Sequence, residues 1–264
     1  MTSKPKNKLS ATVNKKPLIT IATVTFNAAD TLPRTLESVE KQSFSNIEHI
    51  IMDGKSKDNT VAIALDYQKR NPDRRIIVTS EPDKGLYDAM NKAIDRAKGK
   101  YIVFLNAGDK LHDKDTLKLV ADKAALSPAI IYGDTNIVDN SGTFVRRRRL
   151  SPPPVLTWKS FKAGMLVCHQ SFYASTSIVP HYNLKYRFSA DFDWCIRIMK
   201  EAKKHNRQNE LIDAPLTDYL EEGMTTANHK ASLKERFRIM AHHYGLTPTI
   251  LQHIWFVARA VIRK

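Results

Sequence analysis

The polar run between residues 80 and 94 is the part of the chain best suited to contact a charged ligand; it reads Ser-Glu-Pro-Asp-Lys-Gly-Leu-Tyr-Asp-Ala-Met-Asn-Lys-Ala-Ile. An acidic, glycine-containing turn leads directly into a segment that carries Tyr87, Asp88, Asn91 and Lys92. So many polar groups close together serve packing poorly, because each needs a partner when it is buried. They suit the binding of a polar, charged ligand at the mouth of a sheet.

Strand and helix patterns alternate around this run. Strands are predicted at 18–26, 47–52, 75–79, 101–105 and 129–132, and helices at 30–42, 58–70, 86–97 and 114–126. Crossovers this short predict an α/β fold, with a mainly parallel, Rossmann-like sheet covered by helices on both faces.

The second half of the chain is less regular. Residues 139–142 have the composition of a hairpin turn between strands at 135–138 and 143–147, and a helix is predicted at 190–204. The tail is predicted to form two helices, at 230–244 and 248–262. We therefore expect a disordered basic N-terminus (1–16), one large domain (17–225) and a basic helical C-terminal tail (226–264).

Four polar clusters follow the predicted strands at their carboxyl ends, at 25–27, 53–58, 83–85 and 106–109. In a parallel sheet these ends meet at one edge, where ligands bind. One such cluster means little, because turns are rich in Asp, Asn and Gly. Four in succession indicate a binding site.

Several classes of protein lack support. The turn after the first strand has no dinucleotide-binding glycine pattern, and the chain has neither a P-loop nor a Gly-x-Ser-x-Gly elbow, which argues against an NAD enzyme, an ATPase and a serine hydrolase. No run of eighteen apolar residues predicts a spanning helix, and the N-terminus lacks the apolar core of a secretory signal. Cys168 and Cys195 have neither metal-site nor disulfide spacing, so we expect two reduced, buried thiols in a cytosolic protein.

The net charge of +15 is concentrated in three segments. Residues 1–17 carry five lysines and no acid, residues 146–149 are four arginines, and residues 229–264 carry seven Lys or Arg against one Glu. Together these segments account for the whole surplus. That distribution favours contact with an anionic surface over a basic groove through the core.

Three segments carry a family resemblance: Ile-Ala-Thr-Val-Thr-Phe-Asn at 21–27, Ile-Ile-Met-Asp-Gly-Lys-Ser-Lys-Asp-Asn-Thr at 50–60, and Glu-Pro-Asp-Lys-Gly-Leu-Tyr-Asp-Ala-Met-Asn-Lys at 81–92. In order and spacing they resemble family 2 glycosyltransferases, most of all the branch of bacterial surface-polysaccharide assembly that includes colanic-acid-type transferases. The resemblance covers about residues 17–225. It implies a GT-A fold and inverting transfer of a sugar from a nucleotide-diphosphate donor, such as a UDP- or GDP-sugar, to a saccharide or lipid-linked acceptor.

The resemblance also assigns donor-binding residues. Thr25, Asn27 and Asp53 would lie around the base and ribose, and Asp83 and Lys84 in the nucleotide pocket. A carboxylate can accept hydrogen bonds from a base N–H or a ribose hydroxyl, and a lysine can neutralise diphosphate charge. The alternative for Asp53 is a capping role for the next helix, although Asp58 is better placed for it.

A divalent ion is the next implication. The family usually has an Asp-x-Asp element after the fourth strand, but residues 105–109 here read Leu-Asn-Ala-Gly-Asp. We expect Mn²⁺ or Mg²⁺ with Asp109 as its main protein ligand and Asn106 facing the ribose or the metal, since magnesium is often bound largely through substrate phosphates. For His169 we expect a role as an additional metal ligand or phosphate contact, or a structural role. The alternative to the metal site as a whole is a metal-independent enzyme.

The catalytic base is predicted in the segment 189–194, which resembles the family's catalytic Glu-Asp segment with Ala190 in place of the Glu. We expect Asp191 to take the proton of the acceptor hydroxyl, with Asp193 in reserve. The alternative is that both are ordinary acids in a first helical turn, favoured by the helix dipole.

The acceptor side is predicted to involve Asp134, His169 and Gln170, because residues 168–171 and the acid after Tyr132-Gly133 resemble segments of the same branch. A flap over the donor is expected at 222–226.

The helix at 249–262 is predicted either to lie at a membrane interface or to pack on the core. We expect a cytoplasmic protein with weak peripheral contact to the inner face of an anionic cell membrane. Two other functions compete. A nucleic-acid-binding protein would explain the charge but lacks a known reader motif, and no nucleic acid is expected as a partner. A sugar-nucleotidyltransferase would need a glycine-rich basic loop that residues 27–30 do not provide.

Overall fold

The computed structural model describes residues 16–221 and 229–262 of the chain. The chain divides into two compact units: residues up to Asp122 together with Ser175–Ser177 form the first, and Lys123–Ala174 with the chain from Ile178 onward form the second. The predicted disorder of residues 1–16 concerns residues that lie almost entirely outside the described part.

The first unit contains four parallel strands: β1 (Ile19–Thr25), β2 (Ile47–Asp53), β3 (Arg75–Ser80) and β4 (Tyr101–Phe104). They lie in the order β3-β2-β1-β4. Every residue of β1 and β2 is buried, as expected for central strands covered on both faces. Short strand β5 (Lys110–Leu111) follows in the chain.

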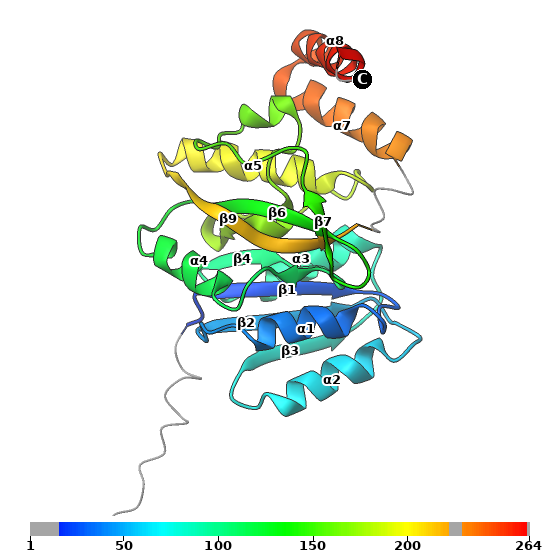
Figure 1. Ribbon diagram of the computed structural model, residues 1–264, viewed down its shortest axis with the longest axis vertical. Helices are drawn as coiled ribbons and strands as arrows, with labels where there is room; N and C mark the ends of the chain where they lie inside the picture. The colour runs from blue at the N-terminus through cyan, green and yellow to red at the C-terminus, as the bar shows by residue number, and fades with distance from the viewer. Residues whose placement is uncertain (1–15, 222–228, 263–264) are drawn as a thin grey trace, which may run out of the picture. The chain divides into compact units, whose positions relative to one another are not determined.

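Helices α1 (Leu32–Glu40) and α2 (Thr60–Arg70) cover one face of these strands, and α3 (Leu86–Arg96) returns the chain to β4 across the other face (Figure 1). The α1–α2 face buries an apolar cluster made of Leu32, Leu36, Ile51, Ala64, Tyr67 and Ile76. Helix α4 (Thr116–Ala124) ends the first half of the chain.

The second unit is built on β6 (Ile130–Val138). This strand pairs in parallel with β9 (Asn209–Leu220) and antiparallel with β7 (Phe144–Arg147) and β8 (Phe172–Ser175). Short 3₁₀ helices η2 (Ser160–Ala163) and η3 (His169–Ser171) lie between β7 and β8, and η4 (Thr176–Ile178) follows β8 in a segment assigned largely to the first unit.

Three longer helices follow: α5 (Ala190–Lys204), α7 (His229–Tyr244) and α8 (Leu246–Ile262). Helix α5 is fixed by Trp194, which is fully buried, stacks on Tyr182 with ring centroids 4.7 Å apart, and donates its ring N–H to the Pro180 carbonyl. Among the helices of the described ranges, none is long and apolar enough to cross a membrane.

The α/β fold class is confirmed, as are the hairpin at β6–β7 and the helix at 190–204. The mainly parallel sheet holds for the first unit, whereas the strands around β6 are mixed. Strand β9 was missed, and β6 runs on through residues 133–138 instead of ending at Tyr132. Both Cys168 and Cys195 are free thiols, the first half-buried and the second buried.

Candidate active site

The strand-end clusters of the first unit lie at one edge of its sheet, as predicted. In the parallel register Thr25 faces Asp53, and Asp53 faces Ser80. The loop after β4 starts at the same edge, because the Leu105 N–H donates to the Ala22 carbonyl three residues before the end of β1.

Asp53 joins three of these strand ends. Its carboxylate accepts hydrogen bonds from the hydroxyls of Thr25 (3.2 Å) and Ser80 (2.6 Å), and from both the N–H (3.0 Å) and the hydroxyl of Ser56. Only 2% of the residue is exposed. A buried carboxylate with this many donors is well satisfied, so Asp53 orients the loop that follows it. The N-cap of α2 is Asn59, which makes no side-chain capping bond; Asp58, one residue earlier, accepts from the Thr60 N–H at 3.0 Å.

Asn27 links the loops after β1 and β2. Its side-chain oxygen accepts from the Lys57 N–H at 2.9 Å, and its own N–H donates to the Ser56 hydroxyl at 2.8 Å. It has a left-handed backbone with φ of 47°, which Asn tolerates better than most residues. The preceding residue, Phe26, is 62% exposed at this edge. Sequence reasoning did not select Phe26, although an aromatic residue directly after a buried strand is a usable signal.

Gly54 brings Asp83 close to the end of β2. A Cβ added at Gly54 would overlap the Asp83 carboxylate and lie 3.4 Å from the Phe26 ring. Asp83 is oriented by the Gly85 N–H, which donates to it at 2.8 Å. The structure thus gathers Asp83, Gly54 and Phe26 into one contact. Gly54 lies in the predicted cluster 53–58, but the sequence indicated no role for it.

Part of the polar run 80–94 stabilises its own turn. Asp88 accepts from the Lys84 N–H at 3.0 Å, and Lys92 donates to the Pro82 carbonyl and pairs with Glu81 at 3.3 Å. The side chain of Lys84 is exposed. This leaves Lys84 and Asp83 as the residues of the run that are best placed for a ligand.

The loop 106–109 is anchored by Thr35 of α1. The Thr35 hydroxyl donates to the Asp109 carbonyl at 2.6 Å and accepts from the Gly108 N–H at 2.9 Å. Asp109 is buried, with 3% of its surface exposed, and Asn106 is half-buried. Within residues 16–221 and 229–262, no group of three or more His, Cys, Asp or Glu is arranged to hold a metal ion. A single carboxylate is a poor cage by itself, so an ion at Asp109 would have to be held mainly by substrate phosphates and water.

The predicted base, Asp191, lies in the first turn of α5 in the second unit. Its Oδ2 atom is 3.4 Å from Nδ1 of His169, and 15% of its side chain is exposed. Burial raises the pKa of Asp191, but the hydrogen bond and charge of His169 and the charge of Arg236 outweigh it, so the pKa is lowered overall. Asp191 is thus ionised at neutral pH, the form that a general base requires.

Asp193 has a different environment. Arg197 Nε lies 2.7 Å from one carboxylate oxygen and His243 Nε2 lies 2.8 Å from the other, and 3% of the side chain is exposed. Burial raises its pKa, and the hydrogen bond from His243 and the charge of Arg197 lower it below its ordinary value. Asp193 is part of a buried ion-pair network between α5 and α7.

The predicted acceptor-side residues fall in neighbouring segments. Asp134 lies at an irregularity in the β6–β9 pairing, and its carbonyl accepts from the Ser171 hydroxyl at 2.9 Å. Gln170 is buried and its side-chain oxygen accepts from the Cys168 thiol at 2.7 Å, so it supports the segment from within. Within this group, His169 is the residue in contact with Asp191. The expected flap at 222–226 lies outside the described residues.

Helix α7 holds the chain just before Asp191. The Glu235 carboxylate accepts from three successive backbone N–H groups, those of Arg187 (2.8 Å), Phe188 (2.8 Å) and Ser189 (2.9 Å). The Ser189 hydroxyl is 2.9 Å from that of Ser232, also on α7. This part of the tail packs on the core, and sequence reasoning missed Glu235 because no local pattern marks a contact across so many residues.

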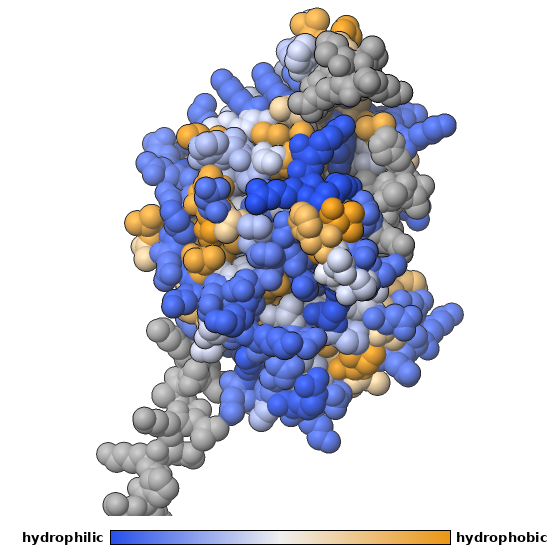
Figure 2. All heavy atoms as spheres, viewed as in Figure 1, coloured by the Kyte–Doolittle hydropathy of each residue, from blue (hydrophilic) through white to orange (hydrophobic). Residues whose placement is uncertain are grey.

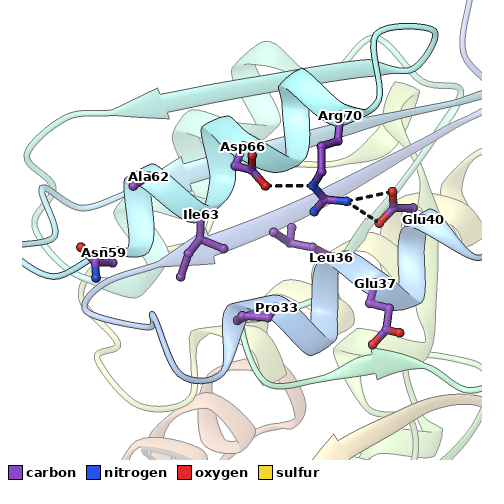
Figure 3. A pocket seen from close by; sticks show the side chains of 9 residues that line it. All are labelled: Pro33, Leu36, Glu37, Glu40, Asn59, Ala62, Ile63, Asp66 and Arg70. Carbon is purple, nitrogen blue, oxygen red and sulfur yellow. Dashed lines mark hydrogen bonds and ion pairs between the residues drawn. The ribbon is translucent and has the colours of Figure 1, made fainter.

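A groove of about 680 Å³ lies elsewhere in the first unit, between α1 and α2 (Figure 3). Arg70 at one end pairs with Asp66 at 2.8 Å and with Glu40 at 3.3 Å. None of the predicted site residues lines this groove, so it is separate from the strand-end edge.

The fold and these residues define a GT-A-type α/β transferase. The chain belongs to glycosyl transferase family 2, whose family model matches residues 20–191. This family membership takes the place of the two competing interpretations, a nucleic-acid-binding protein and a sugar-nucleotidyltransferase.

Two relatives are informative. A Mycobacterium tuberculosis protein named as a PGL/p-HBAD biosynthesis glycosyltransferase is 31% identical over 212 residues, covering 77% of this chain and 78% of the relative. The Bacillus subtilis protein TuaG, named for glycosyltransferase function in teichuronic acid biosynthesis, is 42% identical over 98 residues, or 37% of this chain and 38% of the relative.

Two solved structures share the fold. S. aureus TarS 1–349 in complex with UDP-GlcNAc has a TM-score of 0.67 at 16% identity, covering 90% of this chain and 73% of that chain. The mannosyltransferase PcManGT from Pyrobaculum calidifontis, in complex with GDP-Man and Mn²⁺, has a TM-score of 0.57 at 14% identity, covering 93% and 76%.

Proposed function

We propose that this glycosyltransferase moves a sugar, with inversion, from a nucleotide-diphosphate donor to a saccharide or lipid-linked acceptor in bacterial surface-polysaccharide biosynthesis. The observation that carries the proposal is the convergence of three strand-end loops on Asp53, with Asp83 beside Gly54 at the same edge. The UDP-GlcNAc complex of TarS and the teichuronic acid assignment of TuaG support the donor and the product class.

The donor would bind at the strand-end edge of the first unit. The exposed ring of Phe26 suits stacking on the base, since every base presents an aromatic face. Asp83 would accept from a base N–H or ribose hydroxyl, and Lys84 would face the diphosphate. Thr25, Asn27 and Asp53 would shape the pocket from behind, because their hydrogen bonds fix the two loops. Asn106 would face the ribose.

Asp109 would be the protein ligand of a divalent ion bound largely by the donor diphosphate, as the Mn²⁺ and GDP-Man complex of PcManGT supports. Such an ion stabilises charge on the leaving diphosphate. The protein's own part is to hold Asp109 in place through Thr35.

Asp191 would be the base. It would take the proton of the acceptor hydroxyl as that oxygen forms a bond to the anomeric carbon and the bond to the diphosphate breaks on the opposite side. His169, 3.4 Å away, would orient the carboxylate and stabilise its charged form. Asp134 would line the acceptor side of the same unit.

The test separates transfer from donor binding. The Asp191→Asn variant is expected to lose transfer while keeping the thermal shift that UDP, GDP or their sugars, with or without Mn²⁺, give the unmodified protein. Asp213→Asn, an exposed acid on β9 of the same unit, is the matched control. Full turnover by Asp191→Asn would refute the base assignment, and the absence of any shift with every nucleotide would refute the donor site.

We also place the enzyme in the cytoplasm, in peripheral contact with the inner face of an anionic membrane. The three basic segments of the sequence support that location, because such segments bind anionic lipid surfaces.

A further inference from the structure

Helix α8 exposes a broad apolar face. Six large apolar side chains of this helix are between 44% and 67% exposed, namely Leu246, Ile250, Leu251, Ile254, Trp255 and Val257. At 100° per residue they occupy one half of the helix circumference. Figure 2 shows hydrophobic atoms at the α8 end of the second unit.

The opposite half of α8 packs on α7. Thr249 is buried, and the ring of His253 lies edge-on against Phe237 of α7 with centroids 5.0 Å apart. The α7–α8 contact therefore fixes which side of α8 faces outward. The outward side is the apolar one, whereas a surface helix in water normally turns its polar side outward.

A stripe of exposed cations lies on α7. Lys230, Lys234 and Arg238 are exposed and spaced four residues apart, so they share one side of the helix. The only acid between residues 229 and 264 is Glu235, and its carboxylate is turned inward onto the backbone before α5. The tail thus presents apolar and positively charged groups outward, with no exposed acid in its described part.

We infer that the apolar face of α8 and the cationic stripe of α7 (Lys230, Lys234, Arg238) together form a docking surface for an anionic lipid bilayer. Apolar side chains enter the boundary between headgroups and acyl chains, while lysine and arginine pair with lipid phosphates. A second copy of the chain is a poorer occupant, because it would bring two cationic stripes together. A nucleic acid would pair with the stripe but leave the apolar face uncovered.

This inference deepens the proposed localisation by naming its surface and rests on it, but it does not depend on the transfer reaction. Vesicle binding and transfer to a soluble acceptor are therefore measured separately on the full chain. The expected result is flotation with vesicles containing phosphatidylglycerol, weaker flotation with phosphatidylcholine alone, and loss of binding at high salt.

Two variants divide the surface. The first is a triple variant that combines Leu251→Ser, Ile254→Ser and Trp255→Ser. It keeps the net charge and is expected to abolish flotation. The matched control is Leu65→Ser with Leu119→Ser, two exposed leucines of the first unit, which should float as the unmodified chain does. Replacing Lys230, Lys234 and Arg238 with Gln should weaken binding to anionic vesicles by on the order of a hundredfold.

Fluorescence locates the contact. Trp255 is expected to shift to shorter wavelength on vesicle binding, and Trp255→Phe should remove the shift while retaining flotation. No binding to anionic vesicles, or equal binding by the triple serine variant, would overturn the inference. A dimer that depends on Leu251, Ile254 and Trp255 would show instead that a second copy covers this face. Unchanged unfolding temperatures confirm that each variant is folded.

Discussion

Glu235 offers the sharpest test of how the second unit positions its chemistry. It accepts three backbone hydrogen bonds from the residues that precede α5, at 2.8 to 2.9 Å. Ser189, the residue before α5, makes no side-chain capping bond of its own. The start of the helix that carries Asp191 is therefore fixed by a carboxylate from a different helix.

The magnitude follows from these three bonds. A hydrogen bond to a charged group contributes about 1.5 to 3 kcal/mol, and Glu235 is only half-buried, so Glu235→Ala should cost about 4 kcal/mol. Glu235→Gln keeps one acceptor oxygen and should cost about 1 to 2 kcal/mol, which leaves a typical domain folded. If the first turn of α5 then shifts by about 1 Å, the rate should fall on the order of a hundredfold.

The assay compares kcat with the KM for the donor. Glu235→Gln should lower kcat while the donor KM changes little, because the donor residues belong to the other unit. Asp213→Asn, at an exposed acid on β9 of the same unit, is the control and should change neither constant. A Glu235→Gln protein that is measurably less stable but keeps its full kcat would refute the positioning role and leave Glu235 as a structural residue only.

Two other predictions concern the first unit. Gly54→Ala should displace the Asp83 carboxylate, which the new methyl group would overlap, and should weaken nucleotide binding about tenfold or more while the unfolding temperature changes little. Unchanged nucleotide affinity in Gly54→Ala would contradict the role of Asp83. Burial and the nearby charge of Arg74 lower the pKa of His49 from 6.5 to about 3. As the pH falls, the unfolded chain therefore binds this proton before the folded chain does. The stabilisation is fully present above pH 6.5 and is lost as the pH falls toward 3, at up to about 1.4 kcal/mol per pH unit. Urea titrations at pH 7, 5 and 4 measure this loss, and a His49→Gln protein that loses stability equally steeply with falling pH would show that His49 is not the cause.

The features that could be predicted from the sequence are those that depend on local residue patterns. Helix α5 begins and ends where expected, because two acids occupy its first turn and two lysines its last turn, as the helix dipole favours. The four strand-end clusters were found because parallel topology alone requires them to share an edge. The resemblance pointed to Asp83 and Asp191, which the structure places in contact with Gly54 and His169 respectively.

What the sequence could not predict depends on contacts between distant segments. Strand β9 contains Pro215, Asp213 and Asp218, which break the alternation that marks a strand, yet pairing along β6 imposes the extended conformation. The inward turn of Glu235 has no local signal at all, since an acid in a basic helix suggests only a solvated side chain. The approach of Asp83 to Gly54 depends on the packing of the loops after β2 and β3.

The two acids at the start of α5 show how position, more than pKa, divides their roles. Asp191 and Asp193 are two residues apart, so they project from the helix in directions about 160° apart. Both pKa values are lowered, which means that ionisation does not distinguish them. Asp193 has both oxygens engaged by Arg197 and His243 in a buried network, and a proton taken there would break a paired charge. Asp191 keeps the larger exposed fraction and faces His169 on the predicted acceptor side. The same turn therefore supplies one acid that fastens α7 to α5 and one, Asp191, that we propose as the base. This division is why Asp193→Asn should lower stability before it lowers the transfer rate.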